Sequence, residues 1–262
     1  MLAAELFDVR GHVAFITGAA SGLGLAMSEV LAHNGAWVAM ADLDAAAVAR
    51  EAERLRRAGL GAAPIPLDVA DSAALRAAID DVASRHGRLD AVFANAGVSS
   101  GPGFGSPEGR IENVSMSLWQ RALDVNLTAV FGTVQAAAAH MKRHRSGSIV
   151  VTSSVAALRP APMPGHAYHA TKAAVATLVR VIAIELAPWN IRVNAIAPGP
   201  FATNIAGGRL REPEAQKPFI AGVPMGRVAE PGEIKGLALF LASGASGYVT
   251  GTCIPIDGGT SA

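Results

Sequence analysis

The sequence predicts an α/β fold: a doubly wound parallel sheet of about seven strands with helices on both faces, giving three α/β/α layers. Short segments rich in Val, Ile and Ala alternate with longer amphipathic segments along the chain, the pattern that repeated βαβ units produce. The short segments are almost continuously apolar, as expected for strands that helices cover on both sides. The length suits one domain of this kind, so we expect residues 1–262 to form a single domain.

The predicted elements follow one another in a regular order. Seven segments are strand candidates: HVAFIT (12–17), WVAMAD (37–42), API (63–65), LDAVFAN (89–95), SIVVTS (148–153), IRVNAIA (191–197) and TCIPID (252–257). Helices are expected between them, the first three over 23–35, 44–59 and 71–87. Asp44 and Asp71 begin the second and third, where a carboxylate can accept hydrogen bonds from the free N–H groups of the first turn.

Two segments interrupt this alternation. Ser99–Arg110 is rich in Gly and Pro, and Pro198–Phe219 is long and of mixed character. Long loops inside a compact domain are often functional, so we expect a substrate lid at about 198–222.

Composition excludes several classes of function. Apolar residues make up 51% of the chain, charged residues 16%, and the net charge is +1, so no broad field is available for nucleic acid. The single Cys253 allows no internal disulfide. The N-terminal segment is acidic where a signal peptide is basic, and too short to span a bilayer. We expect a cytoplasmic protein with no nucleic-acid or membrane partner.

A glycine-rich turn, TGAASGLG, follows the first predicted strand and opens a helix. Gly18 permits a tight turn, Gly22 lets the main chain approach a ligand, and Gly24 allows the helix to pack closely on the strand. The free N–H groups of that helix can then bind a pyrophosphate. An ordinary strand-to-helix turn is the alternative interpretation of this motif alone.

Asp42 ends the second predicted strand, at the distance where a dinucleotide site needs a carboxylate for the ribose hydroxyls. A carboxylate there also repels a 2′-phosphate. No Arg or Lys lies in the glycine-rich turn or directly after Asp42, so we expect NAD rather than NADP. The alternative role, a helix cap, is better filled by Asp44.

Further motifs appear in one consistent order: ANAG (94–97), DVNLTAVF (124–131), TSS (152–154), YHATK (168–172), PG-x-x-x-T (198–203) and GYVTGTCIPIDGG (247–259). Together with TGAASGLG, they make the chain resemble the short-chain dehydrogenase/reductase family of single-domain, Rossmann-like enzymes. The resemblance covers nearly the whole chain.

The resemblance implies a catalytic set of Asn126, Ser154, Tyr168 and Lys172. Adjacent Ser153 is an alternative for the catalytic hydroxyl; we favour Ser154 because Val-Ala follows it as the strand ends. The implied cofactor-binding positions are Gly18, Ser21, Gly22, Leu23, Gly24, Asp42, Leu43, Asp68, Val69, Asn95, Ala96, Gly97, Thr152, Tyr168, Lys172, Pro198, Gly199, Phe201 and Thr203. No metal site is expected.

The one-turn spacing of Tyr168 and Lys172 places both side chains on one helix face. A free tyrosine has a pKa of about 10 and is a poor base at neutral pH. A positive charge about 4 Å away, at an effective dielectric near 20, supplies about 4 kcal/mol, enough to lower that pKa to about 7. The resemblance gives Ser154 the role of holding the substrate oxygen and Asn126 that of holding a water that connects Lys172 to solvent. A packed aromatic and a surface lysine are the alternative interpretation.

Three functions stay in competition. The first is an NAD-dependent oxidoreductase of a secondary alcohol, such as a polyol, sugar acid, cyclic alcohol or hydroxysteroid. The second is an NADPH-dependent ketone or 3-ketoacyl reductase, and the third is a dinucleotide-binding regulator without turnover. The predicted helices over 127–141 and 168–186 are apolar over more than one stripe. In similar enzymes such helices pair across a two-fold axis, which implies a homotetramer, with a homodimer as the alternative.

Overall fold

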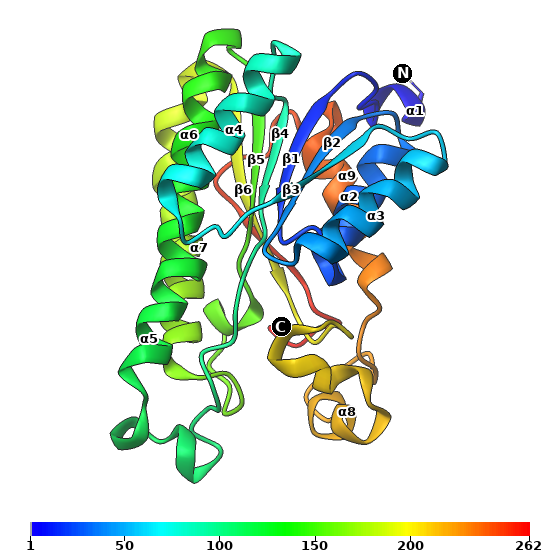
Figure 1. Cartoon of the computed structure of the whole chain (residues 1–262). Coiled ribbons are helices and arrows are strands. Elements are labelled where there is room, and N and C mark those ends of the chain that lie inside the picture. Colours follow the sequence, from blue (N-terminus) through cyan, green and yellow to red (C-terminus); the bar gives the residue numbers. More distant parts are fainter. Residues whose placement is uncertain (1) are drawn as a thin grey trace.

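The computed structural model describes residues 2–262, and it has a central sheet of seven parallel strands between two layers of helices (Figure 1). The strands are β1 Val13–Thr17, β2 Trp37–Asp42, β3 Ala62–Pro66, β4 Ala91–Ala94, β5 Gly147–Thr152, β6 Ile191–Pro198 and β7 Cys253–Ile256. The helices are α1 Ala3–Leu6, α2 Gly22–His33, α3 Ala45–Arg57, α4 Ser72–His86, α5 Met116–Leu123, α6 Ala129–His144, α7 His166–Leu186, α8 Pro213–Ile220 and α9 Lys235–Ala242. The predicted fold class and all seven predicted strands are confirmed.

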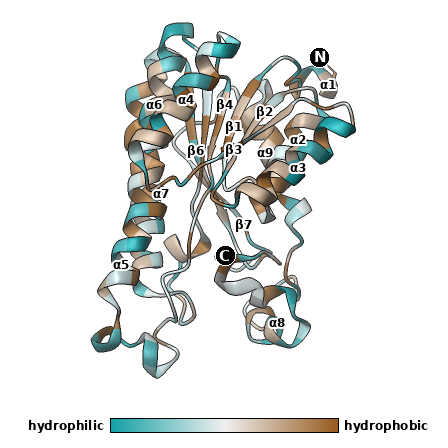
Figure 2. Cartoon of the chain, in the orientation of Figure 1, coloured by the Kyte–Doolittle hydropathy of each residue, from teal (hydrophilic) through white to brown (hydrophobic). Residues whose placement is uncertain are grey.

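Helices α4, α6 and α7 cover one face of the sheet, and α2, α3 and α9 cover the other (Figure 1). Successive side chains of a strand point to opposite faces. In β1, Phe15 accordingly packs into the first layer and Ile16 into the second, and both are fully buried. Figure 2 shows the strands mostly hydrophobic and the helices carrying hydrophilic residues toward the outside. Each of these six helices therefore contributes one apolar side to a core that the sheet divides in two.

The strand order is β3-β2-β1-β4-β5-β6-β7. The order reverses between β1 and β4, which pair directly through Ile16 and Phe93. In open parallel sheets, ligands bind outside the carboxyl ends of the strands at such a reversal. The glycine-rich turn follows β1 and the ANAG motif ends β4, so both lie at this point.

The predicted caps are present. The Asp44 carboxylate accepts a 2.9 Å hydrogen bond from the Ala47 N–H at the start of α3, and the Asp71 carboxylate accepts bonds from the first turn of α4. Gly87 ends α4 with φ of 67°, a conformation that favours glycine.

Two predicted segments differ in the structure. The helix expected from residue 127 begins earlier, because α5 continues through a π-helical turn, η3 Asp124–Thr128, into α6. The long loop expected at 198–219 is largely folded: it contains a 3-10 helix, η6 Ile205–Arg211, followed by α8. The segment thus has local helical structure that its mixed composition concealed.

Within residues 2–262, no helix combines the length and apolar character that crossing a membrane requires.

Candidate active site

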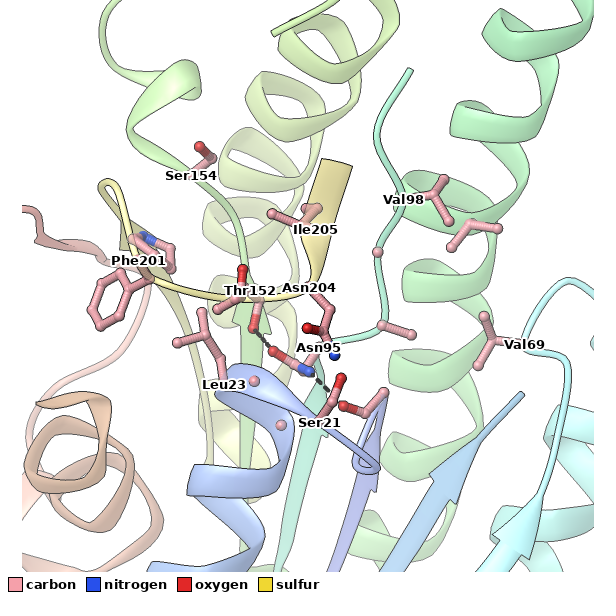
Figure 3. Close-up of a pocket in the computed structure, with 18 of the residues that line it drawn as sticks. Ser21, Leu23, Val69, Asn95, Val98, Thr152, Ser154, Phe201, Asn204 and Ile205 are labelled. Carbon is pink, nitrogen blue, oxygen red and sulfur yellow. Dashed lines mark hydrogen bonds between the residues drawn. The ribbon is translucent and has the colours of Figure 1, made fainter. Parts of the chain in front are cut away.

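A pocket opens at the carboxyl ends of the strands where the sheet order reverses. All predicted cofactor-binding and catalytic positions line this pocket except Asn126, which is fully buried and hydrogen-bonds to the lining residue Val98. Figure 3 shows part of it, with Ser21 on the loop after β1, Leu23 in the first turn of α2, Ser154 after β5, and Phe201, Asn204 and Ile205 on the segment after β6. The residues that line this pocket come from positions between 18 and 210 of the sequence.

The glycine-rich turn has the geometry that the sequence predicts. Gly18 and Gly22 have φ of 67° and 53°, in the left-handed region. A Cβ at Gly24 would lie 2.0 Å from the Gly18 carbonyl oxygen, so only glycine allows α2 to approach β1 this closely. A Cβ at Gly22 would lie 3.3 Å from the Thr203 side chain across the pocket. A bare main chain therefore faces the pocket and leaves room for a ligand.

Asp42 lies at the end of β2 and lines the pocket. One carboxylate oxygen accepts a 2.9 Å hydrogen bond from the Ala20 N–H of the glycine-rich turn, and the other accepts a 3.0 Å bond from the Asp44 N–H. The carboxylate is thus held in place by two backbone donors, and each oxygen keeps a lone pair for another hydrogen bond.

Asn95 connects both sides of the pocket (Figure 3). Its side-chain N–H₂ donates to the carbonyls of Thr17 and Gly18, at 3.0 and 3.3 Å, and its Oδ1 accepts a 3.0 Å bond from the Thr152 hydroxyl. The Thr17 hydroxyl in turn accepts hydrogen bonds from the N–H groups of Asn95 and Ala96. Asn95 therefore fixes the turn after β1 against the end of β5.

The two adjacent serines have different surroundings. The Ser153 hydroxyl donates a 2.9 Å hydrogen bond to the Lys172 carbonyl in α7 and is almost fully buried. Both serines line the pocket, but it is the Ser154 hydroxyl that hydrogen-bonds to the Tyr168 side chain and acts to lower its pKa. The geometry therefore favours Ser154 as the hydroxyl available to a substrate.

Tyr168 and Lys172 both lie on the pocket side of α7, but their electrostatics differ from the expectation. The Lys172 ammonium is 5.6 Å from the centre of the Tyr168 ring and donates a 2.7 Å hydrogen bond to the Thr152 carbonyl. Desolvation raises the pKa of Tyr168 above its usual value, and the Ser154 hydroxyl only partly opposes that rise. Burial also lowers the pKa of Lys172 to about 8. These side chains by themselves therefore do not produce the expected tyrosine pKa of about 7, because burial of the phenol is the largest influence on that pKa.

Asn126 lies in the π-helical turn and is fully buried. Its Oδ1 accepts a 2.8 Å hydrogen bond from the Val98 N–H, and its Nδ2 donates a 2.9 Å bond to the Val98 carbonyl. The amide therefore closes the turn after β4, and the second lone pair of Oδ1 and the second N–H of Nδ2 are left for other partners such as water.

Some pocket residues were not among the predicted positions: Leu67, Val98, Arg121, Val125, Asn204, Ile205 and Leu210. Three of them belong to the helical segment after β6, whose fold the sequence did not predict. The Arg121 guanidinium lies 3.8 Å from the Asp68 carboxylate. Arg121 is in α5, where the sequence alone indicates an ordinary surface arginine. No motif in the sequence distinguishes these residues.

Comparison with known proteins gives the family. A family model described as enoyl-(acyl carrier protein) reductase matches residues 18–261. The chain is 38% identical to a cyclohexanol dehydrogenase of Rhodococcus sp. (strain TK6), with 96% of each chain covered. A solved structure of a short-chain type dehydrogenase/reductase from Mycobacterium marinum is 36% identical, with a TM-score of 0.88 and 98% of each chain covered. The chain belongs to the short-chain dehydrogenase/reductase family.

As a member of this family, the chain is an oxidoreductase that acts on secondary alcohols with a nicotinamide dinucleotide, as the resemblance implied. Its similarity to other members extends over the full length. It is 36% identical to a cis-4-hydroxycyclohexanecarboxylate dehydrogenase of Sinomonas cyclohexanicum, with 98% of this chain and 99% of that one covered. It is 37% identical to a 3-oxoacyl-[acyl-carrier protein] reductase from Brucella melitensis solved with bound NAD, with a TM-score of 0.86 and coverage of 100% and 97%.

Proposed function

We propose that this oxidoreductase oxidises uncharged cyclic secondary alcohols with NAD⁺. One observation carries the proposal: Ser154, Tyr168 and Lys172 line the same pocket as Asp42, so groups suited to alcohol oxidation share a pocket with a carboxylate suited to a ribose.

The residues around the pocket would contact successive parts of a bound dinucleotide. The N–H groups of the turn between Gly18 and Gly24 would hold the pyrophosphate, since Gly18 and Gly22 present main chain without a side chain to the pocket. Asp42 would accept hydrogen bonds from the adenosine ribose, and Lys172 would donate to the nicotinamide ribose. The other proposed contacts come from Ser21, Leu23, Leu43, Asp68, Val69, Ala96, Gly97, Pro198, Gly199, Phe201 and Thr203, all of which line the pocket.

The proposed chemistry divides between three side chains. When bound, NAD⁺ accepts the hydride and brings a positive ring. Tyr168 takes the proton of the substrate hydroxyl at its Oη, and Ser154 holds the substrate oxygen near that atom. Lys172 favours the phenolate as a cation. The raised pKa of Tyr168 means that these protein groups need the added positive charge of the cofactor to produce a base at neutral pH.

The preference for NAD rests on Asp42. Two backbone donors hold its carboxylate in place, so a 2′-phosphate could not displace the charge by a simple rotation. The adjacent Leu43 is exposed and uncharged. No cation near this carboxylate neutralises it among the described pocket residues, whose only cationic members are Arg121 and Lys172.

The substrate class rests on the remaining walls. Beyond the residues assigned to the cofactor and the catalytic set, the described lining consists of five apolar residues, Leu67, Val98, Val125, Ile205 and Leu210, and of the polar Ser153, Arg121 and Asn204. These apolar side chains suit a hydrocarbon ring better than a polyol or a sugar acid. The similarity to a cyclohexanol dehydrogenase supports the same substrate class.

A second candidate is reduction of a 3-oxoacyl group, which the similarity to the Brucella melitensis reductase favours. One surface feature supports it: Lys142 and Arg145 lie 5.7 and 5.3 Å from the centre of the Trp189 ring, just after α7. This cationic surface could attract an acidic carrier protein.

The two candidates are separated by one experiment. Purified protein is given cyclohexanol, cyclopentanol, a linear secondary alcohol and gluconate with NAD⁺ or NADP⁺, and a 3-oxoacyl thioester with NADH or NADPH. We expect the highest kcat/KM for a cyclic alcohol with NAD⁺. Preference for the thioester with NADPH would favour the second candidate. If no pair of substrate and cofactor turned over, the dinucleotide-binding regulator would become the favoured function.

We also propose that the chain works as a homotetramer. Val181 and Ile184 on α7 are 59% and 78% exposed, and Phe131 on α6 is 46% exposed. Such apolar faces on two long helices suit burial against a second copy. Light scattering coupled to size exclusion measures the mass directly, and a monomer at micromolar concentration would contradict this.

A further inference from the structure

The first turn of the catalytic helix lacks a cap of its own. Helix α7 starts after Gly165, an N-cap residue with no side chain to accept hydrogen bonds from the free N–H groups. Tyr168 is the third residue of the helix, the position whose N–H an N-cap side chain usually binds. The proposed catalytic residue thus lies in a turn that its own sequence leaves uncapped.

Ser100, in a distant segment of the sequence, supplies the side-chain acceptor that Gly165 lacks. Its hydroxyl accepts a 3.0 Å hydrogen bond from the Tyr168 N–H, which it shares with the Gly165 carbonyl at 3.1 Å, although Ser100 and Tyr168 are 68 positions apart. Ser100 is only 8% exposed. A Cβ at Gly165 would lie 2.5 Å from this hydroxyl oxygen, so the serine occupies the space that a cap side chain at 165 would need. Gly165 and Ser100 together make one helix cap divided between two segments.

The segment that supplies Ser100 also contacts the residues that precede α7. Its residues 99–110 are held against residues 159–165 by an antiparallel bridge between Pro102 and Pro164 and by a 2.9 Å hydrogen bond from the Gly105 N–H to the Pro162 carbonyl. Ser100 therefore lies where both loops meet the catalytic helix.

We propose that Ser100 is a positioning residue, which holds the first turn of α7 so that the Tyr168 hydroxyl meets Ser154, and which couples residues 99–110 to that hydroxyl. This inference deepens the proposed function and rests on it for the role of Tyr168. Ser100 does not line the pocket, so it acts through Tyr168 rather than on a ligand.

The test compares Ser100→Ala with Ser106→Ala, a serine of the same loop whose hydroxyl makes no hydrogen bond to α7 in the described part of the chain. Loss of a cap should loosen the first turn, so we expect amide exchange over residues 166–170 to accelerate about fivefold in Ser100→Ala alone. Displacement of the phenol should lower kcat about tenfold, with the KM for NAD⁺ changed less than about twofold. The pH at which kcat is half-maximal should rise, because the Ser154 hydroxyl acts to lower the tyrosine pKa.

A second variant guards against misfolding of the first. Gly165→Ala keeps Ser100 but pushes its hydroxyl away, and it should reproduce the faster exchange and the raised half-maximal pH. Unchanged exchange in Ser100→Ala, or equal losses of kcat in Ser100→Ala and Ser106→Ala, would overturn the proposal. If the wild-type protein oxidises no alcohol, the proposed function fails, and the exchange rates still decide whether Ser100 caps α7.

Discussion

The Lys172 ammonium lies 5.6 Å from the centre of the Tyr168 ring and gives its 2.7 Å hydrogen bond to the Thr152 carbonyl instead of to the phenol. Burial disfavours the charged form of both residues: it raises the pKa of Tyr168 and lowers that of Lys172 to about 8. Even so, Lys172 with a pKa of about 8 is still mostly protonated at pH 7.

Replacing Tyr168 by Phe removes the proposed proton acceptor and keeps the ring. We expect kcat for alcohol oxidation to fall by about 100- to 10,000-fold, the range that general acid–base groups contribute. Binding of NADH, followed by its fluorescence, should stay within about threefold of the wild type. Retained turnover in this variant would remove Tyr168 from the mechanism.

Lys172→Met should inactivate the enzyme and stabilise the fold. An unfolded lysine keeps its proton up to a pKa near 10.5, while the buried one loses it near 8, so unfolding takes up a proton between these pH values. Wild-type stability should therefore rise from pH 8 to pH 10.5. At pH 7 the variant avoids a cost of about 3 kcal/mol and loses one hydrogen bond, for a net gain of about 2 kcal/mol. Denaturant unfolding of both proteins at pH 7 and 10 measures it, and a gain that does not shrink at high pH would contradict this origin.

Asp42→Asn should relax the cofactor preference. The amide can still accept the hydrogen bond from the Ala20 N–H, but the negative charge that repels a 2′-phosphate is gone. We expect the ratio of kcat/KM for NAD⁺ over NADP⁺ to fall about tenfold. Adding Leu43→Arg, at an exposed position of the same pocket, should lower the ratio further. An unchanged ratio in both variants would place the discrimination elsewhere.

Gly24→Ala tests the close approach of α2 to β1. The added Cβ would lie 2.0 Å from the Gly18 carbonyl oxygen and 2.6 Å from Asn95 Nδ2, so we expect a loss of about 2–3 kcal/mol in unfolding free energy and weaker NADH binding. Gly236→Ala in α9 is the matched control, since nothing lies within 4 Å of its added Cβ. That variant should gain about 0.5–1 kcal/mol. Thermal unfolding of the two proteins gives the comparison.

The fold and most of the pocket could be predicted because they depend on local patterns. Apolar runs gave the strands, and left-handed glycines and capping carboxylates are imposed by backbone geometry at single positions. The motifs then placed the cofactor positions in order. Pocket residues of the segment after β6, such as Ile205 and Leu210, could not be predicted, because their helical structure depends on packing between distant segments.

Electrostatics was the least predictable part of the site. The one-turn spacing of Tyr168 and Lys172 predicts nearness correctly, but it contains no information on desolvation, which dominates both pKa values. Asn126 shows the same limit, since its hydrogen bonds to Val98 join segments 28 residues apart. Long-range partners decide what a motif residue does.

The Asn95 amide has a consequence for protein engineering. Through Thr17, Gly18 and Thr152 it ties the turn after β1 to the strand whose carbonyl holds Lys172. The cofactor half and the catalytic half of the pocket therefore form one rigid frame. The segment from residue 204 to 222 contributes none of these bonds and contains none of the proposed cofactor contacts. Libraries that exchange residues 204–222 and keep Pro198, Gly199, Phe201 and Thr203 should change which alcohols are accepted while the cofactor contacts are retained.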